Sequence, residues 1–142
     1  MVRRQELAVI ARGASVSKTW LKMIGTTKSP CPDFWTENHV SFRKGKPRGI
    51  QPGDHMVLYA VGRKKRLFAL AEVTSEVYEN GQEEWRYQVD VNYIVNLPVK
   101  SGVSIDQIST KRDLIGPIQW GSSYIELERE EYDQAVALLR AA

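Results

Sequence analysis

The stretch WRYQVDVNYIV, residues 85–95, alternates between apolar or aromatic side chains and polar ones. Its tryptophan, tyrosines and valines occupy odd-numbered positions, and polar residues fill positions 86, 88, 90 and 92. Successive side chains of a β-strand point to opposite faces, so this pattern predicts a long strand with one face on a core. The other face would meet water or a partner. An asparagine–glycine pair at 80–81 predicts the turn before this strand.

Two apolar stretches upstream predict a buried hairpin. Residues 55–61 read HMVLYAV and residues 67–77 read LFALAEVTSEV. Both are nearly continuously apolar, which is typical of strands with neither face exposed to solvent. Five residues, GRKKR, separate them, which suits an antiparallel connection. The sequence Pro52-Gly53-Asp54 predicts a turn ahead of the hairpin, and SSYIEL at 122–127 predicts a last strand.

Helices are expected at three places. After a short strand at Glu6–Arg12, the segment Ser15–Ile24 has apolar residues at near-helical spacing and predicts a helix. Ser104–Ile108 predicts a helical turn with Ser104 as its cap. Arg129–Arg140 carries apolar residues at i, i+3, i+4 and i+7 and predicts a closing helix. Residues 26–53, rich in proline, glycine and basic side chains, predict a long ordered loop with a brief extended piece at Asn38–Phe42.

These elements predict one α+β domain spanning residues 1–142. Short strands in this number favour a small curled sheet or barrel with helices at its rim. The 142-residue chain is 42% hydrophobic and 26% charged, the balance of an ordinary globular protein. No segment has the roughly 18 consecutive apolar residues of a membrane helix. The N-terminal stretch lacks the apolar run of a signal peptide, and Cys31 has no partner for an internal disulfide. We therefore expect a cytoplasmic protein with no membrane contact.

Charge is unevenly distributed along the chain. Residues 1–49 carry 10 lysines and arginines against 3 acidic residues, whereas residues 101–142 carry 4 against 7. A basic N-terminal third is suited to lie over the phosphates of a nucleic acid and gain affinity from counterion release. The alternative is a solvated basic surface with no such partner.

The sequence offers little for catalysis. His39 and His55 lack metal-ligand spacing, and Cys31 between two prolines has no evident base beside it. Neither a phosphate-binding P-loop nor a dinucleotide-binding glycine motif is present. We expect no catalytic residues, no metal site, no cofactor and hence no enzyme.

The aromatic residues carry more information. Tryptophan and tyrosine combine a flat apolar face with a polar edge and so stack well on nucleic-acid bases. For Trp20 and for Tyr87, Tyr93 and Tyr132, a place in the core is the better interpretation. Trp35 and Trp120 lie in loop contexts and are candidates for the wall of a pocket.

Several segments resemble EVE domains of the PUA-like superfamily. The match runs in consistent order through 50–139: the strand entry QPGDHMVLY at 51–59, FALAEV at 68–73, the strand at 85–91, Leu97-Pro98-Val99, and the closing strand and helix. The N-terminal third departs from the family pattern, with LAVIA at 7–11 and FWTENH at 34–39 where other motifs are typical.

This resemblance implies a pseudo-barrel of five to six mostly antiparallel strands with peripheral helices and a pocket between a loop and the sheet rim. Such domains, like the related YTH and ASCH groups, are proposed to hold a modified base of DNA or RNA. Carried over by position, the ligand-binding residues would be Trp35, Asn38, Tyr59, Trp120, Ser122 and Ser123. Arg43, Lys44, Lys46 and Arg48 would hold phosphates.

Two other functions remain open from the sequence. The same pocket would serve a small-molecule or nucleotide-binding protein, or a minor enzyme. Alternatively, the basic loop would dock a partner protein, with no functional pocket.

Overall fold

The computed structural model describes residues 17–142 apart from 44, 63–64 and 120–122. The strand expected at Glu6–Arg12 lies outside the described residues. The main strands are β1 (Thr19–Ile24), β2 (His39–Phe42), β3 (His55–Ala60), β4 (Arg66–Val73), β6 (Tyr87–Asn96) and β8 (Tyr124–Glu126). The strands β5 (Tyr78–Glu79) and β7 (Val103–Ser104) are two residues long. The helical elements are η1 (Val99–Ser101), η2 (Ile105–Gln107), α2 (Ile115–Gln119) and α3 (Arg129–Ala141).

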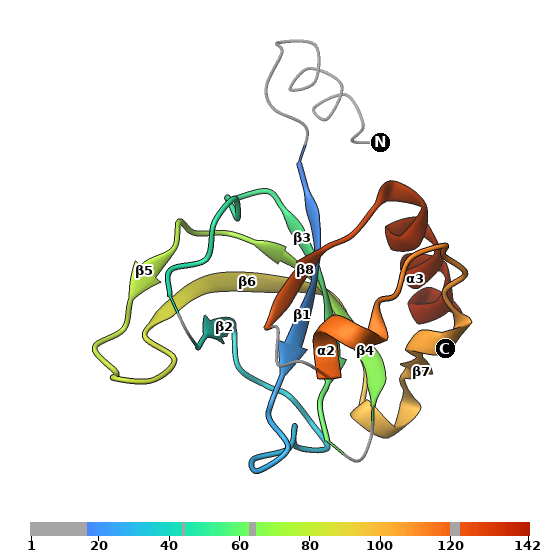
Figure 1. Cartoon of the computed structure of the whole chain (residues 1–142), viewed down its shortest axis with the longest axis horizontal. Coiled ribbons are helices and arrows are strands. Elements are labelled where there is room, and N and C mark those ends of the chain that lie inside the picture. Colours follow the sequence, from blue (N-terminus) through green and yellow to red (C-terminus); the bar gives the residue numbers. More distant parts are fainter. Residues whose placement is uncertain (1–16, 44, 63–64, 120–122) are drawn as a thin grey trace, which may run out of the picture.

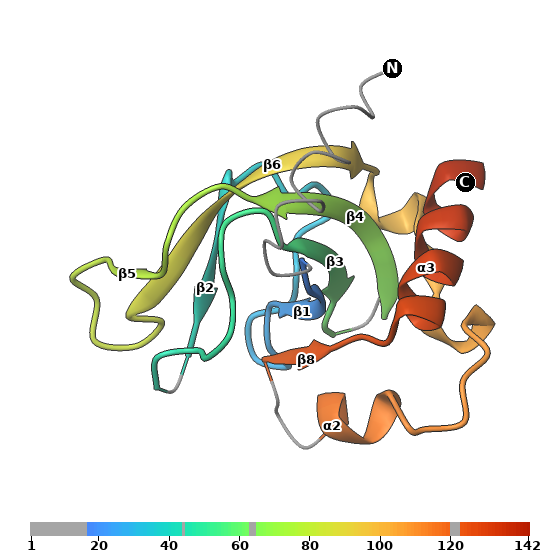
Figure 2. The same cartoon turned by 90° about the horizontal axis from the view of Figure 1, so that it is seen from above.

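The strands form a curled mixed sheet in the order β2-β6-β4-β3-β1-β8, and this sheet bends into a half-barrel (Figures 1 and 2). In addition, β5 pairs with β6 and β7 pairs with β4. The pairing of β1 with β3 is parallel, and the other strand pairs described are antiparallel. The chain is therefore a small α+β protein with a barrel-like sheet, as expected.

Strand β6 confirms the alternating pattern. Val89 and Val91 are buried, whereas Asn92, Ile94 and Asn96 are exposed. Its pairing with β4 shifts by one residue beside Leu70, and an irregularity of this kind bends a strand. The bend contributes to the curl visible from above in Figure 2.

The buried hairpin is also confirmed. β3 and β4 pair antiparallel, and nearly all of their side chains are buried. Their side chains feed two hydrophobic clusters, one lined by residues such as Phe42 and Phe68 and the other by residues such as Leu70 and Leu139. Both faces of this hairpin are therefore covered, which explains the continuous apolar sequence.

The prediction of a helix over Ser15–Ile24 is wrong for its described part. Residues 19–24 form β1, which lies between β3 and β8. Five consecutive residues from Trp20 to Ile24 are buried, because the strand packs on both faces. Apolar residues at 20, 23 and 24 fit a helical face equally well, so periodicity did not separate the two structures.

A turn ahead of β3 fixes the start of β1. Gly53 has a φ of +94°, which a residue with a side chain adopts only at a cost, and it places the buried Asp54 beneath β1. The Asp54 carboxylate accepts hydrogen bonds from the Trp20 indole, the Lys18 backbone and the Gln51 backbone. Gly53 and Asp54 thus hold the start of β1 beside the start of its parallel partner β3.

The C-terminal elements cover the second cluster. Helix α3 confirms the closing helix and packs Ala135 and Leu139 on the sheet, at the right of Figure 1. The predicted turn at Ser104–Ile108 corresponds to η2, where the Ser104 side chain accepts a hydrogen bond from the Asp106 backbone. Helix α2 was not anticipated. Among the described residues, none of the helices has the length and apolar character needed to cross a membrane.

Candidate ligand pocket

A cavity of about 470 Å³ is lined by residues of β1 and β2, two strands that are not neighbours in the sheet. Four segments line it: β1 with the loop that follows it (22–26 and 28–32), Trp35, the outward side of β2 (His39, Ser41 and the following Arg43), and Glu84 with Trp85 ahead of β6. Segments far apart in the sequence therefore converge here, which is typical of a binding site on a folded scaffold.

The loop after β1 forms one wall of the pocket. Gly25 has a φ of +91°, and a Cβ built there would lie 2.5 Å from the backbone nitrogen of Cys31. The backbone of Thr26 donates to the Ser29 carbonyl, and Cys31 donates to the carbonyl of Val61. Glycine at this position lets the chain fold back tightly on itself, so the wall stands close to β1.

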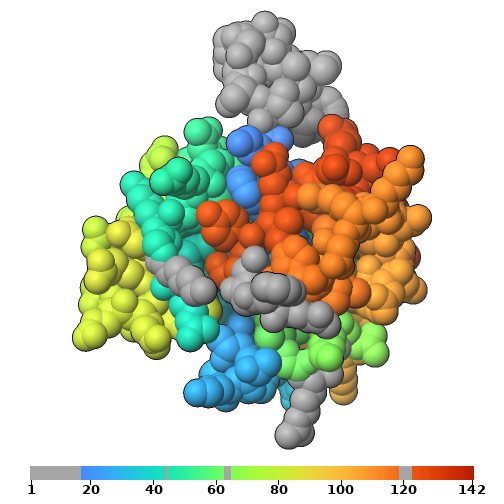
Figure 3. All heavy atoms as spheres, in the orientation of Figure 1, coloured from blue at the N-terminus to red at the C-terminus, as the bar shows by residue number. Residues whose placement is uncertain are grey.

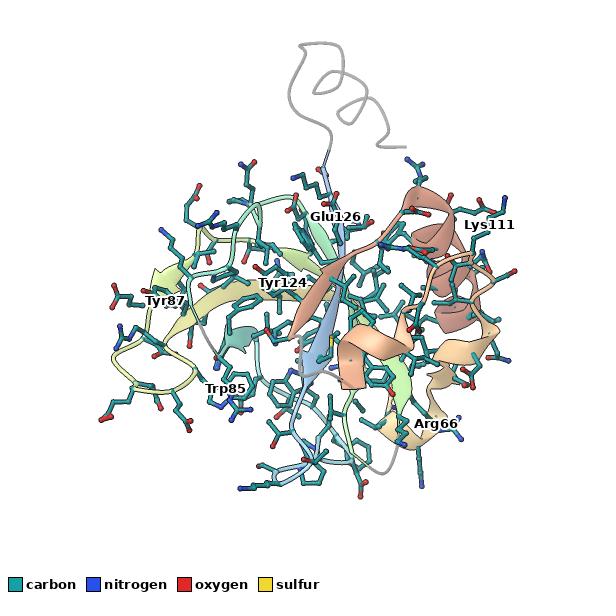
Figure 4. The ribbon with its side chains drawn as sticks, viewed as in Figure 1. Arg66, Trp85, Tyr87, Lys111, Tyr124 and Glu126 are labelled. Atoms are coloured by element: carbon teal, nitrogen blue, oxygen red, sulfur yellow. The ribbon has the colours of Figure 1, made fainter. Side chains whose placement is uncertain are left out.

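Trp85 forms a second, aromatic wall. Its φ of +58° is unusual for a bulky residue, and the side chain of Asn80 donates a hydrogen bond of 2.7 Å to its carbonyl. The backbone of Asn80 also donates to the Arg86 carbonyl, which closes the loop. The loop thereby directs the half-buried Trp85 side chain into the lining of the pocket, near the lower left of the sheet in Figure 4.

Trp35 is half-buried on the opposite segment. Asn96 of β6 donates to its carbonyl at 3.0 Å. The indole nitrogen is buried and has no hydrogen-bond partner among the described residues. Burial raises the pKa of Tyr93 to about 12, and the nearby Trp35 side chain partly offsets that rise. Tyr93 therefore stays neutral at physiological pH, and its hydroxyl donates to the Glu37 carbonyl.

Lys22 contributes a buried amine to the pocket lining. Its side chain lies on the central part of β1, the residue is 1% exposed, and Nζ donates to the Met23 carbonyl at 2.8 Å. The same nitrogen lies 4.8 Å from the centre of the Phe42 ring and 5.7 Å from that of Trp85. Burial lowers the pKa of Lys22 to about 7, because the charged form loses its hydration.

The remaining polar groups come mainly from β2. His39 and Ser41 line the pocket, and the His39 ring lies 4.0 Å from the carboxylate of Glu37. The Arg43 guanidinium is 5.8 Å from the centre of the Trp85 ring, within the range of a cation–π contact. The pocket therefore combines flat aromatic faces with hydrogen-bonding and positively charged groups.

The structure brings two of the residues named from the sequence, Trp35 and Arg43, into this pocket. Lys46 and Arg48 are exposed farther along the same loop and do not line it. Asn38 is exposed, and its carbonyl accepts a hydrogen bond from the Val91 backbone. The three basic residues belong to the basic loop that follows β2 (residues 43–50, of which 44 is not described). Figure 3 shows this loop, in cyan to green, at the surface beside the yellow segment that includes β5.

The other named residues lie elsewhere. Tyr59 is buried and lines a separate, more apolar cavity of about 790 Å³ together with Ile115 and Ile118. Ser123 is half-buried, and its carbonyl accepts a hydrogen bond from the Met23 backbone. The residues that lie outside the described part of the chain are Lys44, Trp120 and Ser122.

Sequence reasoning missed several lining residues. Lys22 was read as part of a helix, and Trp85 as the first core residue of the long strand, whereas β6 begins only at Tyr87. His39 was considered as a metal ligand or as a base for Cys31, and not as part of a ligand pocket. One sequence signal for Trp85 was its position five residues after Asn80, close enough to the predicted Asn80-Gly81 turn to belong to that loop and not to the strand. Over residues 17–142, leaving aside those not described, no group of three His, Cys, Asp or Glu residues is placed to hold a metal.

Comparisons with known proteins define the fold. No protein-family model and no curated protein matches this sequence. Solved structures do. A hypothetical protein from Leishmania major is 14% identical, with a TM-score of 0.58 over 89% of this chain and 96% of its own. A protein from Agrobacterium tumefaciens is 16% identical, with a TM-score of 0.56 over 88% and 92%. One from Rhodopseudomonas palustris is 14% identical, with a TM-score of 0.56 over 87% and 94%. At these identities the likeness concerns the fold alone.

Proposed function

We propose that this protein is a PUA-like binding module that holds a planar base of DNA or RNA, with or without a modification, in the pocket between Trp35 and Trp85. The observation that carries the proposal is the convergence of two tryptophans on one cavity that also has a positively charged rim. The role that the sequence suggested for Trp120 passes to Trp85, which the structure places in the pocket lining.

The size and walls of the pocket support this proposal. Its volume of about 470 Å³ lies within the range of roughly 300–1,000 Å³ typical of sites for small ligands. Extraction of a base from its stack costs a few kcal/mol, and stacking on an aromatic side chain returns about 1–3 kcal/mol per base. Two indoles are therefore sufficient to offset the cost, and hydrogen bonds from groups such as Ser41 add selectivity.

The basic loop beside the pocket supports a polymer over a free base. Arg43 lies at the pocket itself, and Lys46 and Arg48 are exposed on the residues that follow. The backbone of Arg48 donates to the Tyr124 hydroxyl of β8, which holds this loop against the sheet. A strand whose base enters the pocket would pass its flanking phosphates over these side chains.

The test is a titration of tryptophan fluorescence with short DNA and RNA oligonucleotides, with and without modified bases. Binding should quench the fluorescence. Trp85→Ala and Trp35→Ala should each weaken the affinity for the oligonucleotide by roughly 5- to 150-fold, the equivalent of 1–3 kcal/mol of lost stacking. Phe34→Ala is the matched control, since Phe34 is 62% exposed next to Trp35 and does not line the pocket.

Two outcomes would contradict the proposal. Failure of every oligonucleotide to bind at low salt would exclude a nucleic-acid ligand. Equal loss of binding in Phe34→Ala and Trp85→Ala would place the contact on the surface of the loops and not in the pocket. Saturable binding of free nucleotides with little dependence on salt would instead identify a small-molecule site.

A further inference from the structure

The amine of Lys22 is buried and makes no ion pair with a carboxylate of the described residues. Among the described residues, its recorded polar contact is the 2.8 Å hydrogen bond to the carbonyl of Met23, and no ion pair involves it. Its other neighbours are the rings of Phe42 and Trp85. An ammonium group has three donors, so this one retains capacity for a further acceptor.

The surroundings of the amine are predominantly positive. The other charged or titratable side chains that line the pocket are Lys28, Cys31, His39, Arg43 and Glu84. Behind the Phe42 ring, the Tyr124 ring packs edge-on at 5.3 Å. Of the described residues that line the pocket, one is a carboxylate and three are lysine or arginine. A cavity of this charge favours an anion over a neutral ligand of the same shape.

We propose that the preferred ligand of this pocket is a planar ring that bears an acid group, and that Lys22 recognises the anionic oxygen of that group. The inference rests on the proposed function for the stacking of the ring between the tryptophans, and it adds the chemistry of one edge of the ligand. The acid group would supply the counter-charge that the folded chain withholds from Lys22.

Binding of such a ligand is linked to a proton. Burial holds the pKa of Lys22 near 7, so a substantial fraction of the amine is neutral in the empty pocket at physiological pH. An anion beside the amine favours its charged form, so the amine takes up a proton as the acid binds. A neutral ring has no comparable effect. The affinity for the acid should therefore fall as the pH rises through 7, and the affinity for the neutral ring should stay level.

The experiment compares uracil-5-carboxylate with uracil-5-carboxamide, two rings that differ in charge and little in shape. Tryptophan fluorescence would follow their binding to the full chain at pH 6 and pH 8. The acid should bind at least tenfold more tightly than the amide at pH 6. Its affinity should fall roughly tenfold by pH 8, as expected for loss of one proton with a pKa of about 7. Lys22→Met should abolish both effects.

Three controls identify the titrating group. His39→Gln, Cys31→Ala and Lys28→Met should each keep the pH dependence of acid binding, although Lys28→Met removes one positive charge from the lining. Because the pH profile of the unaltered protein is itself a measurement, the inference stays testable if Lys22→Met does not fold.

The outcomes separate the two proposals. Oligonucleotide binding without a preference for the free acid, or with a pH dependence that persists in Lys22→Met, overturns this inference alone. Absence of binding by every oligonucleotide and both rings overturns the proposed function, and this inference with it.

Discussion

At the scale of single residues, Lys22 is the most consequential side chain in the structure. Lysine is seldom fully buried, and here the side chain is buried with its amine near the rings of Phe42 and Trp85. The attraction of the rings offsets part of the lost hydration. What remains is a penalty on the charged form, visible in the pKa of about 7.

The pKa of Lys22 predicts how stability depends on alkaline pH. Above pH 7 the folded protein loses this proton, whereas the unfolded chain keeps it until about pH 10.5. The unfolded state binds more protons in that window, so the free energy of unfolding should rise with pH, by roughly 2–3 kcal/mol between pH 7 and pH 9. Urea denaturation at the two pH values measures the rise. The same rise in Lys22→Met would show that another group is responsible.

The residues of the pocket show why its sequence signals were partial. Trp35 was identifiable because a tryptophan in a loop is a candidate for a pocket wall, and Arg43 was named as one of four basic residues of the same loop. Lys22 was not, since nothing in a sequence distinguishes a buried lysine from the many that are solvated. Trp85 fits the alternating pattern of β6, so the sequence placed it in that strand. Its positive φ breaks the extended backbone, and β6 begins at Tyr87.

At the scale of elements, β1 and α3 behave differently. The helical interpretation of β1 failed because a strand covered on both faces has no period of two, and its parallel partner β3 lies more than 30 residues away. The elements α3, β3, β4 and β6 were predicted because each carries its own period or its own turn. Pairing order depends on contacts distant in sequence, so the sheet topology was not predictable from the local pattern.

Helix α3 is anchored by one ion pair, which predicts acid sensitivity. The side chain of Arg112 donates to Glu131, a residue 1% exposed, and these bonds chiefly hold the Glu131 pKa at about 2. As pH falls below about 4.5 the unfolded chain takes up this proton first, so stability present above that pH is lost toward pH 2.

Glu131→Gln should therefore lower the free energy of unfolding at pH 7 by roughly 2–3 kcal/mol and make it less sensitive to pH between 5 and 3. Denaturant titration at pH 7, 5 and 3 tests this. Asp133→Asn is the matched control on the same helix. Its ion pair with Arg129 is exposed and should contribute little. Similar losses in the two variants would contradict the assignment.

At the scale of the whole molecule, charge is divided between two ends. The basic loop after β2 lies on one side of the curled sheet, whereas α3, with much of the acidic charge of the C-terminal third, lies on the other (Figure 1). This division predicts that nucleic acid approaches from the pocket side. Figure 4 shows Lys111 at the far side of the molecule from Trp85, so Lys111 should not contact a nucleic acid bound at the pocket.

The proposed contacts between phosphates and the basic loop predict how binding depends on salt. Three or four neutralised phosphates should weaken the binding of a single-stranded oligonucleotide roughly 20- to 50-fold between 50 and 200 mM salt. Replacement of Arg43, Lys46 and Arg48 together by glutamine should remove most of that dependence. Lys111→Gln should not change it. An unchanged salt slope in the triple variant, measured by the same titration, would place the phosphates elsewhere.

The backbone conformation of Trp85 implies a trade-off between stability and activity. A bulky residue in the left-handed region costs of order 1–3 kcal/mol, and the hydrogen bond from the Asn80 side chain to the Trp85 carbonyl holds it there. Glycine would relieve that cost and remove the pocket wall in the same step. Selection for thermal robustness alone would therefore replace this tryptophan, and directed evolution of a hardier variant should lose ligand affinity first at this position.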